Sequence, residues 1–193
     1  MIVWVDTETT GLDPERGDLL EVALVVTDDD LAEVAATASV VQPIAPMSAV
    51  AWMKSLSPII QEMHGKNGLF DEIMDGHSAH LHVVEDALCA LVGAAAKERL
   101  FDLKKTPLAG STGGFDRAWL RRHMPRLEAL FSYRSIDVSS FTEIARRWAP
   151  AIYDGKPRAK PEEIVHRALP DVLRESIAIL RYYRESGFVG GAK

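Results

Sequence analysis

The sequence predicts one α/β domain in which helices flank a mixed β-sheet. Two observations predict this class: three apolar or β-branched segments joined by short turns come first, and further short strands then alternate with helices. The length of 193 residues is sufficient for one domain with a sizeable core. We find no internal repeat or low-complexity stretch. We expect residues 1–187 to form the domain and residues 188–193 to form a disordered tail.

Strands are expected in five places. Residues 1–5 are apolar and rich in β-branched and aromatic side chains, which is typical of a buried strand. Residues 19–27 and 33–42 are the next two strands, and the short turns between them indicate an antiparallel meander. Shorter strands are predicted at residues 107–110 and 133–137. The N-terminal strand should therefore lie inside a mixed sheet.

The clearest predicted helix covers residues 78–100, where apolar side chains recur at helical spacing. Residues 48–64 also predict a helix, with Ser48 as its N-cap and an interruption at Pro58. Shorter helices are predicted at residues 69–74 and 115–123, after Pro125, and at residues 139–148 with Ser139 as the N-cap. Residues 153–161 combine glycine, prolines and basic side chains, which indicates a mobile loop.

The composition is that of an ordinary globular protein, with 47% hydrophobic and 26% charged residues. A net charge of −6 argues against a tight, sequence-independent grip on long duplex DNA, which needs many basic contacts to phosphates. The single cysteine, Cys89, excludes an intramolecular disulfide and fits a reducing compartment. No apolar run is long enough to cross a membrane, and the N-terminus does not resemble a signal peptide. We therefore expect a cytoplasmic protein without membrane contact.

Asp6 and Glu8 directly follow the first strand. Residues two apart in an extended chain point to the same side, so the two carboxylates should lie together. Neighbouring carboxylates repel each other unless a cation lies between them, and hard oxygen ligands suit Mg²⁺ or Mn²⁺. The alternative is that this D-x-E pair is only the polar start of a loop.

Asp116 is expected in the first turn of the helix at residues 115–123. The positive end of the helix dipole stabilises an ionised carboxylate there, which prepares it to bind a cation. The alternative, which Asp116 taken alone favours, is a first-turn acid that serves only the start of its helix.

His166 and Asp171 lie five residues apart, a spacing that on one helix would place them on different faces. Proline favours the first helical position, so we expect the last helix to run from about Pro170 to Glu185, with His166 on the loop before it. A loop histidine can approach a site that Asp171 helps to build. The alternative is a surface histidine and an acid that serves only the helix start.

Together these groups suit a two-metal phosphodiesterase site. Asp6, Glu8, Asp116 and Asp171 would bind two divalent ions, Mg²⁺ or Mn²⁺, which stabilise the attacking and leaving oxygens at a phosphate. His166 would take a proton from the attacking water, because an ordinary histidine pKa near neutrality suits general-base catalysis.

The string DTETTGL at residues 6–12 resembles the first motif of the DEDD exonucleases, which have a ribonuclease H-like fold. The four acids, with the H-x4-D spacing at the end, resemble the DEDDh pattern of 3′-to-5′ exonucleases. Further segments resemble oligoribonucleases: EMHGKNGL, PLAG, YRSIDVSS, RRW, HRAL, and the stretch from ESI to YYR. The resemblance implies that residues 1–187 are a DEDDh exonuclease domain.

The same resemblance implies a homodimeric enzyme that degrades short single-stranded oligoribonucleotides, down to dinucleotides, to 5′-mononucleotides. It places Leu12 against the terminal base and His64 in the substrate pocket. Tyr133 and Arg134 would approach the partner's substrate, and a cap on the 5′ phosphate of that substrate would comprise Thr112, Arg134 and Ser139.

The sequence departs from the oligoribonuclease pattern at Thr9, Ser111, Phe115 and Pro170, and Thr7-Glu8-Thr9 is also typical of DNA proofreading subunits. Two other functions therefore stay open: a DEDDh exonuclease acting on single-stranded DNA, and a nucleic-acid-binding module without catalytic activity. The complete set of four acids and a histidine argues against the binding module. A preference for substrates of two to five nucleotides would indicate an oligoribonuclease rather than the single-stranded DNA exonuclease.

Overall fold

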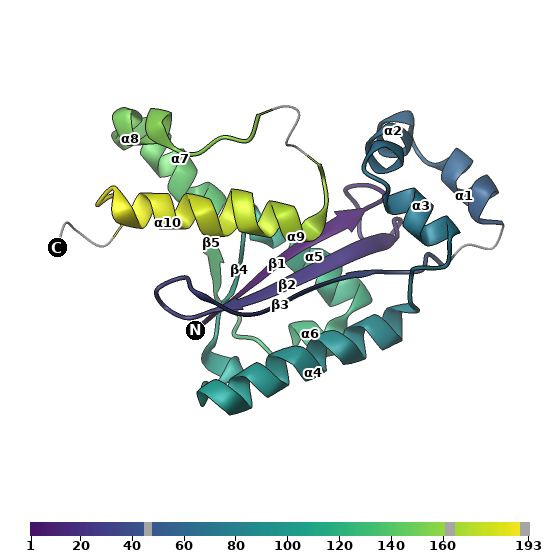
Figure 1. Cartoon of the computed structure of the whole chain (residues 1–193), viewed down its shortest axis with the longest axis horizontal. Coiled ribbons are helices and arrows are strands. Elements are labelled where there is room, and N and C mark those ends of the chain that lie inside the picture. Colours follow the sequence, from purple (N-terminus) through teal and green to yellow (C-terminus); the bar gives the residue numbers. More distant parts are fainter. Residues whose placement is uncertain (45–47, 161–164, 190–193) are drawn as a thin grey trace.

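The computed structural model describes residues 1–44, 48–160 and 165–189, and within them a five-stranded sheet has helices on both faces (Figure 1). The strand order is β3-β2-β1-β4-β5. The antiparallel part contains β1 (Ile2–Thr9), β2 (Leu19–Thr27) and β3 (Glu33–Val40), whereas β4 (Leu108–Gly110) and β5 (Ser135–Asp137) continue the sheet in parallel. The predicted mixed sheet with an internal N-terminal strand is confirmed.

Side chains of β1 alternate between two hydrophobic layers. Val3 and Val5 pack with α4 (Leu81–Arg99) and α5 (Gly113–His123) on one face. Trp4 packs on the other face with α7 (Val138–Trp148) and the C-terminal helices. These C-terminal helices are α9 (Ala168–Asp171), a π-helical segment (Val172–Ile177) and α10 (Ala178–Glu185). The alternation fixes which layer each polar residue at the end of β1 faces.

Three short helices cover the edge of the sheet near the end of β1: α1 (Ala49–Ser55), α2 (Pro58–Lys66) and α3 (Leu69–Met74) (Figure 1). Ser48 caps α1 by accepting a hydrogen bond from the Ala51 N–H, and Pro58 begins α2, so the predicted N-cap and interruption are confirmed. Trp52 and Phe70 pack there against Leu20 of β2. The remaining short elements are a 3₁₀ turn (Leu103–Lys105), α6 (Pro125–Glu128) and α8 (Pro150–Gly155).

Several predicted boundaries were wrong, each for a local reason. β1 does not end at Val5, because residues 6–9 pair with β2. α4 begins at Leu81 rather than at residue 78, because Ala79 forms a bridge with Val41. α7 is capped by Asp137 rather than Ser139: the Asp137 carboxylate accepts the Ser139 N–H at 2.9 Å.

Two corrections concern the C-terminal third. The predicted loop at residues 153–161 begins inside α8, which Pro150 starts at the position that favours proline. The last helix begins at Ala168 rather than at Pro170, because the Glu21 carboxylate accepts the Ala168 N–H at 2.9 Å and so satisfies a helix-start donor. Of the predicted tail, Phe188 packs 5.4 Å from the Tyr183 ring, while residues 190–193 lie outside the described residues, as does Pro161 of the predicted loop.

In the described part of the chain, no helix combines the length and the apolar character needed to span a membrane.

Candidate active site

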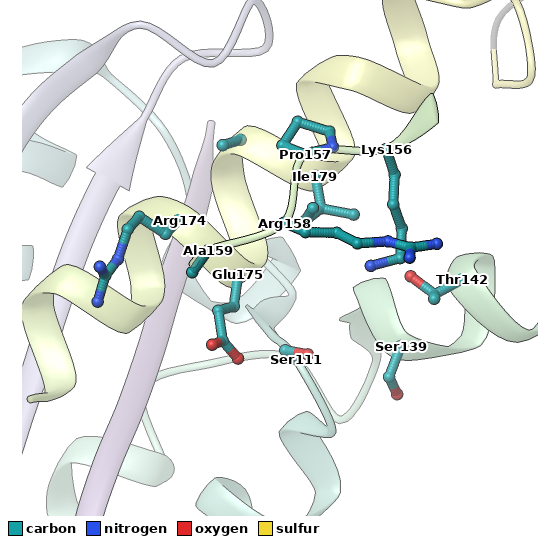
Figure 2. Close-up of a pocket in the computed structure, with 11 residues that line it drawn as sticks. Ser111, Ser139, Thr142, Lys156, Pro157, Arg158, Ala159, Arg174, Glu175 and Ile179 are labelled. Atoms are coloured by element: carbon teal, nitrogen blue, oxygen red, sulfur yellow. The ribbon is translucent and has the colours of Figure 1, made fainter. Parts of the chain in front are cut away.

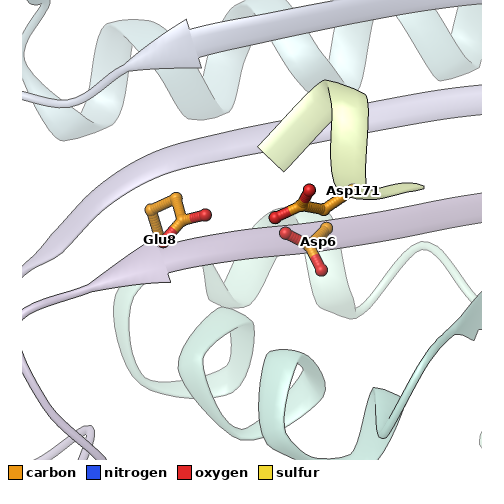
Figure 3. Close-up of side chains that lie close together, drawn as sticks. All are labelled: Asp6, Glu8 and Asp171. Atoms are coloured by element: carbon orange, nitrogen blue, oxygen red, sulfur yellow. The ribbon is translucent and has the colours of Figure 1, made fainter. Parts of the chain in front are cut away.

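Three carboxylates meet where β1 passes the first turn of the C-terminal helices (Figure 3). Asp6 and Glu8 lie on the same face of β1 as Trp4, which is the face covered by α9 and α10. Asp171, the last residue of α9, faces them. One oxygen atom from each of the three carboxylates lies within 4.8 Å of the others. The structure thus brings together three of the four predicted metal ligands.

Burial and mutual repulsion disfavour the ionised forms of these carboxylates. Burial raises the pKa of Asp6 to about 9, and the charges of Asp116 and Asp171 add to the rise. Burial likewise raises the pKa of Glu8 to about 9, with a further contribution from Asp6. Burial also raises the pKa of Asp171, although Arg174, 3.1 Å from it, acts in the opposite direction. A divalent cation would offset this repulsion, so the oxygen donors fit Mg²⁺ or Mn²⁺.

We expect the metal-free protein to lose stability as the pH rises from about 5 to about 9. Carboxyl groups in the unfolded chain ionise near pH 4, whereas Asp6 and Glu8 in the folded chain have a pKa of about 9. Unfolding therefore releases protons in this window, so the free energy of unfolding falls with rising pH. Thermal unfolding in EDTA measures this effect, and added Mg²⁺ should raise the Tm most at about pH 8.5. A Tm in EDTA that is constant across the window would contradict the expectation.

Asp116 lies beside this group rather than within it. It is in the first turn of α5, as predicted, and is 3% exposed. The Thr7 hydroxyl donates a hydrogen bond to its Oδ1 at 2.8 Å, and Thr7 points to the α5 face of β1, opposite to Asp6. Burial raises the pKa of Asp116 to about 6, while the Thr7 hydrogen bond lowers it. Asp116 is close enough for its charge to raise the pKa of Asp6.

His166 lies on an exposed loop directly before α9, which confirms the predicted loop position. Its φ angle of 46° is in the left-handed region, which is uncommon for a residue other than glycine. The charge of His166 lowers the pKa of Asp171. The role of His166 as the general base stays a prediction.

A buried ion pair attaches the His166 segment to the sheet. Glu21 on β2 is 2% exposed and lies directly opposite Glu8 in the strand register. Arg167 donates hydrogen bonds to both carboxylate oxygens of Glu21, the shortest at 2.8 Å, and a further one to Glu72 at 2.7 Å. The guanidinium therefore offsets the negative charge that Glu21 would otherwise place next to Glu8.

An apolar cavity of about 610 Å³ adjoins Glu8. Leu12, which is 87% exposed, lines it together with Ile59, Met63 and Phe115. The predicted contact of Leu12 with a terminal base stays a prediction.

His64 lies on α2, the helix that also lines this cavity, and is completely buried. Its ring packs edge-on against Phe70, and its Nε2 atom is 3.2 Å from the Thr9 carbonyl oxygen. Burial lowers the pKa of His64, which favours a neutral ring. In this structure His64 is therefore placed to support the end of β1 rather than to line the cavity.

The residues predicted for the phosphate cap separate into two places. Thr112 and Ser139 meet at the Asp137 carboxylate, whose Oδ1 accepts the Thr112 N–H at 3.0 Å and the Ser139 hydroxyl at 2.7 Å. Tyr133 is 79% exposed, and the Arg134 guanidinium lies 5.3 Å from the centre of its ring. The structure thus joins Thr112 with Ser139 and leaves the Tyr133–Arg134 pair at the surface.

A second cavity, of about 450 Å³, lies between α7, the C-terminal helices and residues 156–159 (Figure 2). Ser139 and Glu175 line it, together with Lys156 and Arg158, whose side chains lie close to each other in Figure 2. Burial lowers the pKa of Lys156, and the neighbouring Arg158 charge lowers it further. With Arg174, three basic side chains of the described residues line this cavity, which we call the basic cavity, and together with the serine they can bind an anionic group even though the acid Glu175 also lines it.

Sequence reasoning missed Glu175, Glu21 and the cavity that Lys156 and Arg158 line. Glu175 follows Asp171 by four residues, and that helical spacing was a usable signal. Its charge raises the pKa of Asp6. Glu21 was marked by its position as the charged residue within the apolar strand LLEVALVVT. The basic residues at 156–160 were noticed, but nothing in the sequence places them over a cavity.

Comparison with known proteins finds an exonuclease family model and oligoribonucleases that align with nearly the whole chain. The model of the exonuclease (RNase_T) family matches residues 3–180. The oligoribonuclease of Tropheryma whipplei is 42% identical over 193 residues, which is 99% of this chain and 95% of that protein. The oligoribonuclease of Mycobacterium tuberculosis is 39% identical over 188 residues, 97% of this chain and 81% of that protein.

Solved structures show the same fold at low sequence identity. A zinc-bound complex of Escherichia coli exonuclease I with single-stranded DNA matches 95% of this chain and 40% of that one, with a TM-score of 0.68 and 15% identity. Exonuclease X in complex with duplex DNA matches 97% of this chain and 93% of that one, with a TM-score of 0.54 and 21% identity. The fold is therefore ribonuclease H-like, as predicted. By its family match and by relatives that align along nearly its whole length, the chain belongs to the oligoribonuclease family of DEDDh 3′-to-5′ exonucleases.

Proposed function

We propose that this exonuclease hydrolyses short single-stranded oligoribonucleotides, down to dinucleotides, and releases 5′-mononucleotides. The observation that carries the proposal is the position of the carboxylates between two cavities. Glu8 lines the apolar cavity. Arg174, which donates a hydrogen bond to Asp171, lines the cavity that contains Lys156 and Arg158. If each cavity binds one nucleotide and the carboxylates bind the scissile phosphate between them, the bound substrate is a dinucleotide. The names of the 38–42% identical relatives support the same substrate class.

Asp6, Glu8, Asp116 and Asp171 would bind two divalent ions, Mg²⁺ or Mn²⁺. When bound, the ions stabilise the charge that develops on the attacking and leaving oxygens. His166 accepts a proton from the attacking water at a ring nitrogen. Asp171 supports this role, because its carboxylate stabilises the protonated imidazole that results.

The two cavities suggest how the substrate lies. Leu12 and the apolar cavity would receive the 3′-terminal base, with His64 supporting the end of β1 beside it. The 5′ phosphate would lie near Thr112 and Ser139, while Arg134, which lies beside the exposed Tyr133 ring, would reach the 5′ phosphate of the substrate bound to the other copy. The Ser139 hydroxyl donates to Asp137, so an anion at this place needs compensating cations, and Lys156 and Arg158 of the basic cavity supply them.

The chain would act as a cytoplasmic homodimer in which Tyr133 approaches the substrate of the other copy. Tyr133 and Trp148 support this proposal, because they are large aromatic side chains that are 79% and 78% exposed in the single chain. The free cysteine, Cys89, is consistent with a reducing compartment. Light scattering that shows a monomer at micromolar concentration would remove the dimer.

A cleavage assay with Mg²⁺ or Mn²⁺ tests the substrate class. We expect a 5′-phosphorylated RNA dinucleotide to be cleaved with a higher kcat/KM than an RNA 20-mer or a DNA 20-mer. The physical reason is that only a dinucleotide places its terminal 5′ phosphate at the cavity lined by Lys156 and Arg158, whereas a longer strand places a less charged internal phosphodiester there. Faster cleavage of the DNA 20-mer would instead support the single-stranded DNA exonuclease.

Variants of the basic cavity serve as a charge control within that assay. Lys156→Gln/Arg158→Gln should raise KM for the phosphorylated dinucleotide about tenfold, as expected for loss of charge-assisted hydrogen bonds. Lys97→Gln/Arg99→Gln removes the same charge from the far end of α4 and should leave KM within about twofold. Equal effects of the two double variants would point to long-range steering instead of direct contact.

A further inference from the structure

Asn67 connects the catalytic loop to the buried end of β1. It follows α2 directly, and its side-chain Nδ2 donates a hydrogen bond to the His166 carbonyl oxygen at 2.5 Å, across 99 residues of sequence. Its Oδ1 accepts the Leu69 N–H at 3.0 Å, which fixes the amide at the start of α3. The contact to His166 is therefore made by a side chain that is itself held in place.

The second amide hydrogen of Asn67 points toward the interior. Nδ2 lies 3.4 Å from the His64 Nδ1 atom, and His64 Nε2 lies 3.2 Å from the Thr9 carbonyl oxygen. A carbonyl oxygen only accepts, so His64 carries its proton on Nε2 and accepts from Asn67 at Nδ1. The same His64 Nε2 atom is 4.0 Å from Glu8 Oε2. A continuous polar chain thus runs from the Glu8–Thr9 end of β1 through His64 and Asn67 to His166.

His166 needs such a contact because of its backbone conformation. A φ of 46° lies in the left-handed region, which is unfavourable for a residue with a side chain. His166 is exposed, so burial does not keep it in this conformation. The side chain of Arg167, the next residue, is bound to Glu21, and the Asn67 amide binds the carbonyl oxygen of His166 itself. Together the two contacts fix the direction in which the His166 ring leaves the loop.

We propose that Asn67 is a positioning residue for His166: its amide keeps the His166 peptide oriented so that the imidazole faces the carboxylate site. The inference rests on the proposed general-base role of His166. It assigns to the helix that lines the apolar cavity a second task, which is to align the base with the metal ligands. Asn67 itself does not touch the substrate.

Asn67→Asp is the most informative variant. Aspartate keeps the oxygen that accepts the Leu69 N–H, but it replaces the donor to His166 by an oxygen that repels the carbonyl. We expect kcat on the dinucleotide to fall about tenfold and KM to stay within about twofold. Lys66→Gln, which changes an exposed side chain one residue earlier, is the matched control and should leave both constants unchanged. Asn67→Ser, which retains an acceptor but cannot reach His166, gives the same test if the aspartate variant folds poorly.

A readout without turnover comes from the amide signal of Arg167 in NMR spectra of the metal-free protein. That N–H belongs to the peptide whose carbonyl Asn67 binds, so it should shift in Asn67→Asp and not in Lys66→Gln. In a His166→Ala background, Asn67→Asp should cause no further loss of kcat.

Three results would overturn the inference. These are an unchanged kcat in Asn67→Asp, an Arg167 amide that does not move, and an equal loss of kcat with and without His166. Full activity of His166→Ala would overturn the proposed role of the histidine itself, and with it the inference. A low activity of His166→Ala with full activity of Asn67→Asp would leave the proposed function intact and refute the inference alone.

Discussion

Asp6→Asn should lower kcat at least about a thousandfold, because bound metal ions supply several kcal/mol of transition-state stabilisation and Asp6 stands at the centre of their ligand group. Its pKa is raised by burial and by four surrounding acids, Asp116, Asp171, Glu175 and Glu21. A neutral amide of the same size removes the ligand charge without leaving a cavity. Steady-state cleavage of a dinucleotide at saturating Mg²⁺ measures the loss.

The same variant should make the metal-free protein more stable at about pH 8.5. Asparagine removes one of the buried carboxyl groups that release a proton on unfolding at this pH, so the pH-dependent loss of stability should be smaller than in the unmodified chain. The Tm gained on adding Mg²⁺ should also shrink. Asp75→Asn at the end of α3, an exposed acid, is the control and should change neither property. An Asp6→Asn protein that is inactive and also less stable in EDTA would indicate misfolding rather than loss of a metal ligand.

The sequence was sufficient for the strands and for the Asp6–Glu8 pair because both depend on short-range patterns. Alternation along β1 places Asp6 and Glu8 on one face, whatever the rest of the chain does. The start of α5 fixed Asp116 in a first helical turn, and the loop position of His166 followed from a helix signal close by in the sequence.

What could not be predicted depends on contacts between distant segments. The start of the last helix was wrong by two residues, because the group that satisfies the Ala168 N–H is a carboxylate 147 residues earlier in the chain. The same applies to Asn67, whose partner His166 is 99 residues away. The substrate role predicted for His64 stays a prediction, and its complete burial could be seen only once α2 was packed against the end of β1.

Arg167→Met should lower the free energy of unfolding by about 3–5 kcal/mol, the usual cost of leaving one partner of a buried ion pair uncompensated. Without the guanidinium, the Glu21 carboxylate would remain buried and directly opposite Glu8, with the Ala168 N–H as its remaining donor in this contact. Urea unfolding in EDTA measures the change, and Arg184→Met is the control. Arg184 pairs with Asp30 at an exposed site, where solvent screens the ion pair, so its loss should change stability far less.

A double variant separates the charge effect from a loss of packing. Glu21→Gln/Arg167→Met removes the uncompensated charge, while the amide oxygen of the introduced glutamine could still accept the Ala168 N–H. Most of the stability lost in Arg167→Met should therefore return. Activity should not return with it, because Arg167 no longer fixes the segment that presents His166 to Asp171. Equal stabilities of the single and double variants would show that Arg167 acts through its packing, and full activity of the double variant would show that the ion pair does not orient the catalytic loop.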